Sequence, residues 1–138
     1  MPHVLIASDS QSVSAEVHSV LPASGYDVGV VLSGAEVVPA AREKTPDLVI
    51  CDLMMAGMGG VATCMELRLE ASGGRLPEIP LILLLDRRAD VFMARRAGAR
   101  GWVIKPLDPI RLRRAVEAVL AGGSYGDESY KPPTVPAR

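Results

Sequence analysis

The sequence predicts a single α/β domain, in which a parallel sheet is covered by helices on both faces. Short apolar runs alternate five times with segments whose apolar residues recur at helical spacing, and this alternation is the pattern of consecutive β-α units. The run at residues 81–85 is apolar throughout, as expected for a strand that is buried on both faces. A length of 138 residues with 49% hydrophobic residues is enough for one such core.

Five strands are expected, and each is followed by a polar or glycine-containing loop. They cover residues 3–7, 26–32, 47–52, 81–85 and 102–104. Polar residues that follow these strands are the first place to look for a site, because open parallel sheets bind ligands at the carboxyl ends of their strands.

Five helices are expected after these strands, at residues 13–21, 33–44, 61–70, 89–97 and 109–121. Ser33 and Glu36 match the spacing of a capping box at the start of the second helix. Pro39 follows closely and cannot donate a backbone hydrogen bond, so we expect a kink or a late start of this helix. Asp108 followed by Pro109 is a good N-cap and first-turn pair for the last helix.

The globular domain is expected to cover residues 1–121. Residues 122–138 are rich in glycine and proline and show no helical or strand period, which predicts a flexible tail or linker. No apolar run is long enough to span a bilayer and no signal peptide is recognisable. The expected location is therefore the cytoplasm, without a membrane partner.

Charged side chains follow three of the expected strands. Asp9 follows the first strand, Asp52 ends the third and Lys105 follows the fifth. An aspartate after a strand is by itself most often a helix cap, and a Lys-Pro pair is by itself an ordinary turn. If the first and third strands are neighbours, Asp9 and Asp52 share one crevice, with Lys105 on its far side.

The chemistry of such a crevice follows from its charges. Two neighbouring carboxylates repel each other unless a cation joins them. Mg²⁺ is the natural partner, because it takes oxygen ligands, usually one or two carboxylates together with waters and phosphate oxygens. A lysine adds a positive charge for a phosphoryl oxygen. The three groups together predict a site at which a phosphoryl group is transferred to a carboxylate.

Five short segments connect the chain to a known family. They are Val4-Leu5-Ile6-Ala7-Ser8-Asp9, Asp47-Leu48-Val49-Ile50-Cys51-Asp52-Leu53-Met54-Met55, Gly57-Met58-Gly59-Gly60, Gly98-Ala99 and Lys105-Pro106. In this order they resemble the signatures of the receiver (CheY-like) domain of bacterial two-component response regulators, over residues 3–121. The resemblance implies a flavodoxin-like fold with a five-stranded parallel sheet in the order 2-1-3-4-5, and a role in phosphorelay signal transduction rather than as an enzyme.

The resemblance also implies a role for each residue at the strand ends. Asp52 matches the aspartate that accepts a phosphoryl group from a histidine kinase or a phosphotransfer protein. Asp9 matches a direct Mg²⁺ ligand, together with Asp52 and the backbone carbonyl of Met54. Lys105 matches the lysine that contacts the phosphoryl group, and its bond to the following proline is usually cis in the family. Trp102 matches the aromatic switch residue, commonly Tyr or Phe.

Two positions depart from the family pattern. Ser8 stands where the first acidic residue is usual; it can still hydrogen-bond a metal-bound water, so weaker Mg²⁺ binding is expected. Leu85 stands where a Thr or Ser usually contacts the phosphoryl group and couples phosphorylation to the aromatic switch. Losing such a hydrogen bond costs roughly 1.5–3 kcal/mol. A one-residue misalignment would place Leu84 or Asp86 there, and neither carries a hydroxyl.

Three functional hypotheses remain open. In the first, Asp52 is phosphorylated and the output switch is unconventional. In the second, the chain is a degenerate receiver that acts as a binding module without phosphorylation. The survival of Asp9, Asp52 and Lys105 favours the first, and Mg²⁺ binding would separate the two. A flavin- or nucleotide-dependent enzyme is disfavoured, because the sequence has no GxGxxG after the first strand and no P-loop lysine motif.

Residues 87–114 are strongly basic, although scattered arginines most often form a solvated face. In the resembling family, the face formed by the fourth helix, fifth strand and fifth helix commonly binds a downstream protein or mediates dimerisation. A basic face here predicts an acidic partner surface, with a homodimer as the other arrangement. The arginines expected on it are Arg87, Arg88, Arg95, Arg96, Arg111 and Arg114. A net charge of −1 and the lack of a following helix-turn-helix segment argue against nucleic acid.

Overall fold

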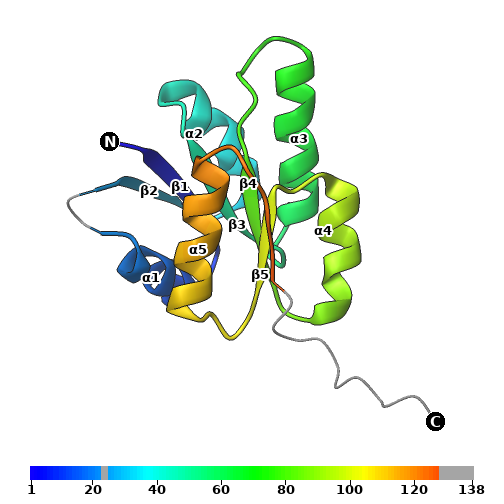
Figure 1. Cartoon of the computed structure of the whole chain (residues 1–138). Helices are drawn as coiled ribbons and strands as arrows, with labels where there is room; N and C mark the ends of the chain where they lie inside the picture. The colour runs from blue at the N-terminus through cyan, green and yellow to red at the C-terminus, as the bar shows by residue number, and fades with distance from the viewer. Residues whose placement is uncertain (23–24, 128–138) are drawn as a thin grey trace.

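The computed structural model describes residues 1–22 and 25–127 of the chain. Within them, a parallel sheet lies between two layers of helices (Figure 1). The strands are β1 (His3–Ala7), β2 (Asp27–Val31), β3 (Leu48–Asp52), β4 (Leu81–Leu85), β5 (Gly101–Ile104) and β6 (Tyr125–Gly126). The α-helices are α1 (Gln11–Val20), α2 (Val37–Glu43), α3 (Gly60–Ser72), α4 (Val91–Ala97) and α5 (Pro109–Leu120). None of the helices in these residues has the length and apolar character needed to cross a membrane.

The strand order is β2-β1-β3-β4-β5-β6, and every neighbouring pair is parallel. The predicted order 2-1-3-4-5 is therefore confirmed for the first five strands. Helices α1 and α5 cover one face of the sheet, while α2, α3 and α4 cover the other (Figure 1).

The strand β4 shows why the sheet needs helices on both faces. Its side chains alternate between the two layers, as the period of an extended chain requires. Leu83 and Leu85 pack with residues of α2, α3 and α4, whereas Ile82 and Leu84 pack with residues of α1 and α5. All four side chains are fully buried. An unbroken apolar run is therefore what this position in the sheet demands.

The second helical segment starts late, as the proline predicted. A 3-10 turn at Gly34–Glu36 comes first, and the α-helix begins only at Val37. The predicted capping box does not form: the Glu36 carboxylate instead accepts hydrogen bonds from the Leu32 N–H (3.0 Å) and the Ser33 hydroxyl (3.1 Å). The Ser33 side chain accepts no capping bond from the turn.

The last helix begins as predicted. The Asp108 carboxylate accepts hydrogen bonds from the backbone N–H groups of Ile110 (2.8 Å) and Arg111 (3.2 Å), which have no partner within the helix. Pro109 occupies the first turn, where a backbone N–H is not needed.

The end of the described chain corrects one prediction. The sequence predicted a flexible segment from residue 122 onward and five strands, but Tyr125–Gly126 forms a sixth strand beside β5. The Asp127 carboxylate then accepts a hydrogen bond from the Ile104 N–H (2.8 Å), and the Asp127 N–H donates to the Trp102 carbonyl (3.2 Å). Two residues are too few to show a period, so this pairing left no pattern in the sequence. The rest of the predicted tail lies outside the described residues.

Candidate functional site

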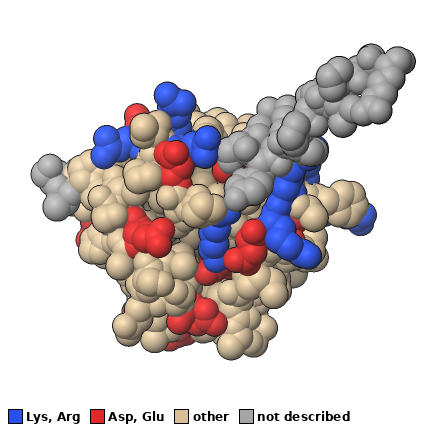
Figure 2. Space-filling model, turned by 90° about the horizontal axis from the view of Figure 1, so that it is seen from below, with Lys and Arg blue, Asp and Glu red and all other residues tan. Residues whose placement is uncertain are grey.

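The loops that follow β1, β3 and β5 meet at one end of the sheet. A view onto this end shows acidic and basic side chains side by side rather than a surface of one charge (Figure 2). Asp52 lies at the end of β3 and is only 2% exposed. Its two carboxylate oxygens have different partners: the Lys105 ammonium donates to Oδ1 (2.7 Å) and the Ser8 hydroxyl donates to Oδ2 (3.0 Å).

These contacts pair the buried carboxylate with an ammonium and a hydroxyl, and a hydrogen bond to a charged group contributes about 1.5–3 kcal/mol. Burial by itself would lower the pKa of Lys105. The hydrogen bond and charge of Asp52, with those of Asp86, outweigh burial and raise the pKa of the lysine above its usual value. Lys105 therefore carries a positive charge at neutral pH.

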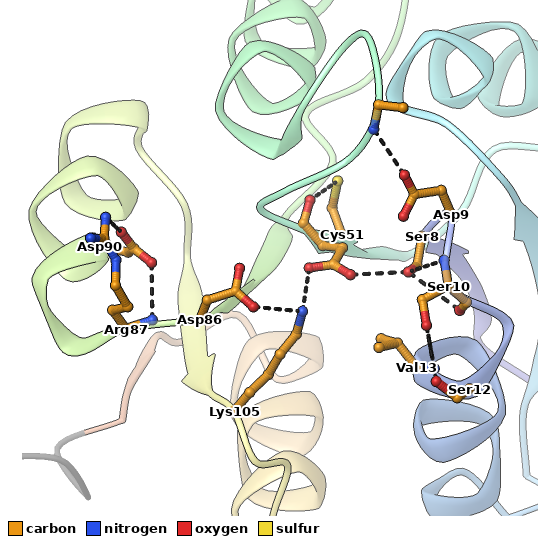
Figure 3. Close-up of polar contacts among 12 residues, drawn as sticks. Ser8, Asp9, Ser10, Ser12, Val13, Cys51, Asp86, Arg87, Asp90 and Lys105 are labelled. Atoms are coloured by element: carbon orange, nitrogen blue, oxygen red, sulfur yellow. Dashed lines mark hydrogen bonds and ion pairs between the residues drawn. The ribbon is translucent and has the colours of Figure 1, made fainter.

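Asp9 follows Ser8 but turns toward a different partner. Its Oδ2 accepts a hydrogen bond from the Ala56 N–H (2.8 Å), in the loop between β3 and α3 (Figure 3). The strands β1 and β3 are neighbours, as expected. However, the β1-end side chain that touches Asp52 is Ser8, and Asp9 instead holds the loop in place.

The oxygen atoms at this end of the sheet are of the chemical type that Mg²⁺ binds. In the part of the chain that the structure describes, there is no cluster of three or more His, Cys, Asp or Glu side chains that suits a metal. Mg²⁺ usually needs only one or two carboxylates, with waters completing its shell. Asp9, Asp52 and the carbonyl of Met54, two residues after Asp52, would be such an oxygen-only set. Both carboxylates already accept hydrogen bonds, but an ionised carboxylate has about four acceptor positions, so a metal could bind beside these contacts.

The two predicted switch residues lie on β4 and β5. Leu85 is fully buried and packs with Ala94 and Ile104, so this strand end presents no hydroxyl. Trp102 is partly buried, and the Arg95 guanidinium lies 5.5 Å from the centre of its ring. Such a cation–π contact holds the indole against α4.

The peptide bond between Lys105 and Pro106 is cis, as the family resemblance implied. The lysine lies directly after β5 and reaches back to Asp52, and its side chain is 23% exposed.

Two residues that shape this site were not predicted to have a role in it. Asp86 follows β4, and its Oδ1 lies 3.2 Å from the Lys105 ammonium (Figure 3). Its only sequence signal was an acidic residue directly after an apolar strand. Gly60 opens α3, and a Cβ there would lie 2.6 Å from both the Asp52 carbonyl oxygen and the Leu83 side chain. Glycine thus lets α3 approach the end of β3; the Gly57-Met58-Gly59-Gly60 segment carried that signal.

The fold and the site together define a class of protein. It is a doubly wound parallel domain with a buried aspartate at the end of its third strand and a lysine on a cis Lys-Pro bond after its fifth. The model of the response regulator receiver domain matches residues 4–117. The chain therefore belongs to the receiver domains of response regulators, which are signal-transduction domains that interact with histidine kinases and downstream effectors.

Curated relatives differ in how much of their length the chain covers. The chain is 31% identical over 122 residues to the protein PilH of Pseudomonas aeruginosa. The aligned region covers 88% of this chain and 100% of PilH. It is 33% identical over 119 residues to the DNA-binding response regulator MtrA of Mycolicibacterium smegmatis. The aligned region covers 85% of this chain and 50% of MtrA. The chain thus spans about half the length of MtrA.

Solved structures agree with this assignment. A signal receiver domain of a signal transduction histidine kinase from Syntrophus aciditrophicus superimposes with a TM-score of 0.78 at 28% identity, over 100% of both chains. A putative response regulator from Chloroflexus aurantiacus gives a TM-score of 0.78 at 28% identity, over 87% of this chain and 98% of that one.

Proposed function

We propose that this receiver domain accepts a phosphoryl group on Asp52 from a histidine kinase or a phosphotransfer protein, with Mg²⁺, and then changes its affinity for a downstream protein. The observation that carries the proposal is the ion pair between the buried Asp52 carboxylate and the Lys105 ammonium, 2.7 Å apart. The lysine is placed to contact a phosphoryl oxygen as soon as the aspartate is modified. In this proposal the domain is a phosphoryl acceptor and binding partner, not an enzyme with a small-molecule substrate.

The transfer is a displacement at phosphorus. A carboxylate oxygen of Asp52 forms a bond to the phosphorus of a phosphohistidine, and the P–N bond breaks. The imidazole nitrogen keeps the electron pair and takes up a proton from solvent. The product is an acyl phosphate on Asp52, and water later releases it as inorganic phosphate and restores the carboxylate. Positioning and charge neutralisation account for most of the catalysis in such transfers.

Each side chain at the site has a part in this scheme. Mg²⁺, held by Asp9, Asp52 and the carbonyl of Met54, would neutralise charge on the phosphoryl oxygens. The Lys105 ammonium, which now donates to an Asp52 oxygen, would donate to a phosphoryl oxygen instead. Ser8 releases or keeps its hydrogen bond to Asp52, depending on which carboxylate oxygen reacts.

The proposed output surface lies on α4, β5 and α5, with β6 paired along the outer edge of β5. Two of its arginines are paired on the same face: Arg87 with Asp90 (3.1 Å) and Arg111 with Asp108 (3.7 Å). The positive charge left for a partner is therefore smaller than the sequence suggested.

An open hollow of about 500 Å³ lies beside Trp102 on this surface. Its lining includes Arg88, Phe92, Arg95, Trp102 and Asp127. A partner that combines acidic and apolar side chains would suit this lining best. A second copy of the chain is the alternative occupant.

A second function is supported by the contacts of the acidic residues. Asp52 and Asp9 both accept hydrogen bonds from neighbouring protein groups, and Leu85 gives the site no hydroxyl. A site satisfied in this way can serve as a rigid part of a binding module that works without phosphorylation.

The deciding experiment is intact mass spectrometry after incubation with acetyl phosphate and Mg²⁺. We expect one labile phosphoryl group on the wild type and on Glu43→Gln, an exposed carboxylate variant at the end of α2. We expect none on Asp52→Asn and none on the wild type without Mg²⁺. A wild type that stays unmodified, while an ordinary receiver domain is labelled in parallel, would leave the phosphorylation-independent binding module as the function.

A further inference from the structure

The Lys105 ammonium lies between two carboxylates. Asp52 Oδ1 is 2.7 Å from it on the buried side, and Asp86 Oδ1 is 3.2 Å from it on the other (Figure 3). Exposure rises in order along this row: the side chains of Asp52, Lys105 and Asp86 are 3%, 23% and 41% exposed. Asp86 is thus the outermost of the three charges, on the solvent side of the lysine.

In this arrangement one ammonium forms ion pairs with two carboxylates. An ammonium has three N–H donors, and each carboxylate takes one of them. A phosphoryl group brings between one and a half and two negative charges at neutral pH. It therefore meets a lysine whose positive charge is already partly neutralised, next to a carboxylate that repels it.

Asp86 is the first residue after the sheet, so its backbone is anchored on one side by a buried strand. It follows Leu85, the fully buried last residue of β4, and β4 pairs with β5, which leads directly into Lys105. The Lys105 N–H also donates to the Leu85 carbonyl (2.8 Å), so the backbones that carry the two charges are joined. The contact between Asp86 and Lys105 is therefore built into two adjacent strand ends.

We propose that Asp86 is a positioning residue of the acceptor site: it restrains the Lys105 ammonium and slows the modification of Asp52 by anionic phosphodonors. This inference rests on the proposed acceptor role of Asp52. Its consequence is that the chain accepts a phosphoryl group more slowly from a small anion in solution than from a partner protein whose contacts draw Asp86 away from Lys105.

The first test compares labelling rates of the full chain with acetyl phosphate and Mg²⁺. Asp86→Asn is expected to raise the second-order rate constant about threefold to tenfold, the effect of one partly screened charge. The gain should shrink as NaCl is added, because salt screens an exposed charge. Asp86→Glu should restore the wild-type rate, and Glu43→Gln should never depart from it. Equal rates for Asp86→Asn and Glu43→Gln would overturn the proposal.

The second test needs no phosphorylation. In ¹⁵N-lysine-labelled protein, the Lys105 ammonium resonance is assigned by its loss in Lys105→Met. We expect Asp86→Asn to shift or broaden it, because a restraining acceptor has lost its charge, and Glu43→Gln to leave it in place. An unchanged resonance in Asp86→Asn would overturn the restraint itself. If the wild type takes no phosphoryl group, the proposed function fails and the rate effect with it, while this spectrum still decides whether Asp86 holds the lysine.

Discussion

Replacing Leu85 by threonine would put a hydroxyl at the end of β4, and we expect it to destabilise the fold. Leu85 is fully buried beside Ala94 and Ile104. Threonine has one heavy atom fewer, and the lost methylene costs about 1 kcal/mol. A hydroxyl without a partner in apolar surroundings costs about 1–3 kcal/mol more. The free energy of unfolding should therefore fall by about 2–4 kcal/mol.

The matched control is Leu85→Val, which has the shape of threonine without its hydroxyl. It should lose only about 1 kcal/mol. Both variants can be measured by urea unfolding, followed by the fluorescence of Trp102, the single tryptophan of the chain. If threonine proves as stable as valine, the hydroxyl has found a partner at the strand end. The inference that only apolar groups surround the side chain at position 85 would then be wrong.

Three further predictions follow from individual contacts. Asp127→Ala removes the acceptor of the Ile104 N–H, so unfolding free energy should fall by about 1–3 kcal/mol and hydrogen exchange at Ile104 should accelerate; unchanged exchange would contradict the pairing. Backbone N–H groups at the start of α5 lower the pKa of Asp108, so its stabilisation is complete above the ordinary carboxyl pKa of 3.8 and is lost as pH falls below it. The melting temperatures of wild type and Asp108→Ala should differ at neutral pH and converge in acid, and a gap that persists in acid would refute the assignment. Gly60→Ala pushes a methyl against the Asp52 carbonyl and should cost about 1–3 kcal/mol in urea unfolding; a neutral result would mean that α3 can move away.

Much of this domain could be predicted from local patterns. Alternating apolar runs and amphipathic segments predicted the five β-α units, and the apolar run at Leu81–Leu85 predicted a strand covered on both faces. Pro39 predicted the late start of α2, and Asp108 predicted the cap of α5. These features depend on residues close together in the chain, so the sequence displays them directly.

The contacts of the site could be predicted only in part. Asp52 and Lys105 were identified from their places at strand ends, and they do form a pair. The orientation of Asp9 could not be predicted, because it depends on the path of the loop that brings the Ala56 N–H to its carboxylate. Asp86, the second carboxylate that contacts Lys105, belongs to no recognisable motif, so nothing in the sequence distinguished it from an ordinary loop residue.

Local patterns in the sequence were enough to predict the layers of the fold and the strand ends that carry charge, and they led to Asp52 as the proposed phosphoryl acceptor. The packed fold was needed to show that Ser8 rather than Asp9 contacts Asp52 and that Lys105 also contacts Asp86. It also decided that two residues after α5 extend the sheet. The physical reason is the same in each case: periodicity and capping act between near neighbours in sequence, whereas these contacts join strand ends and loops that only the packed sheet brings within hydrogen-bonding distance.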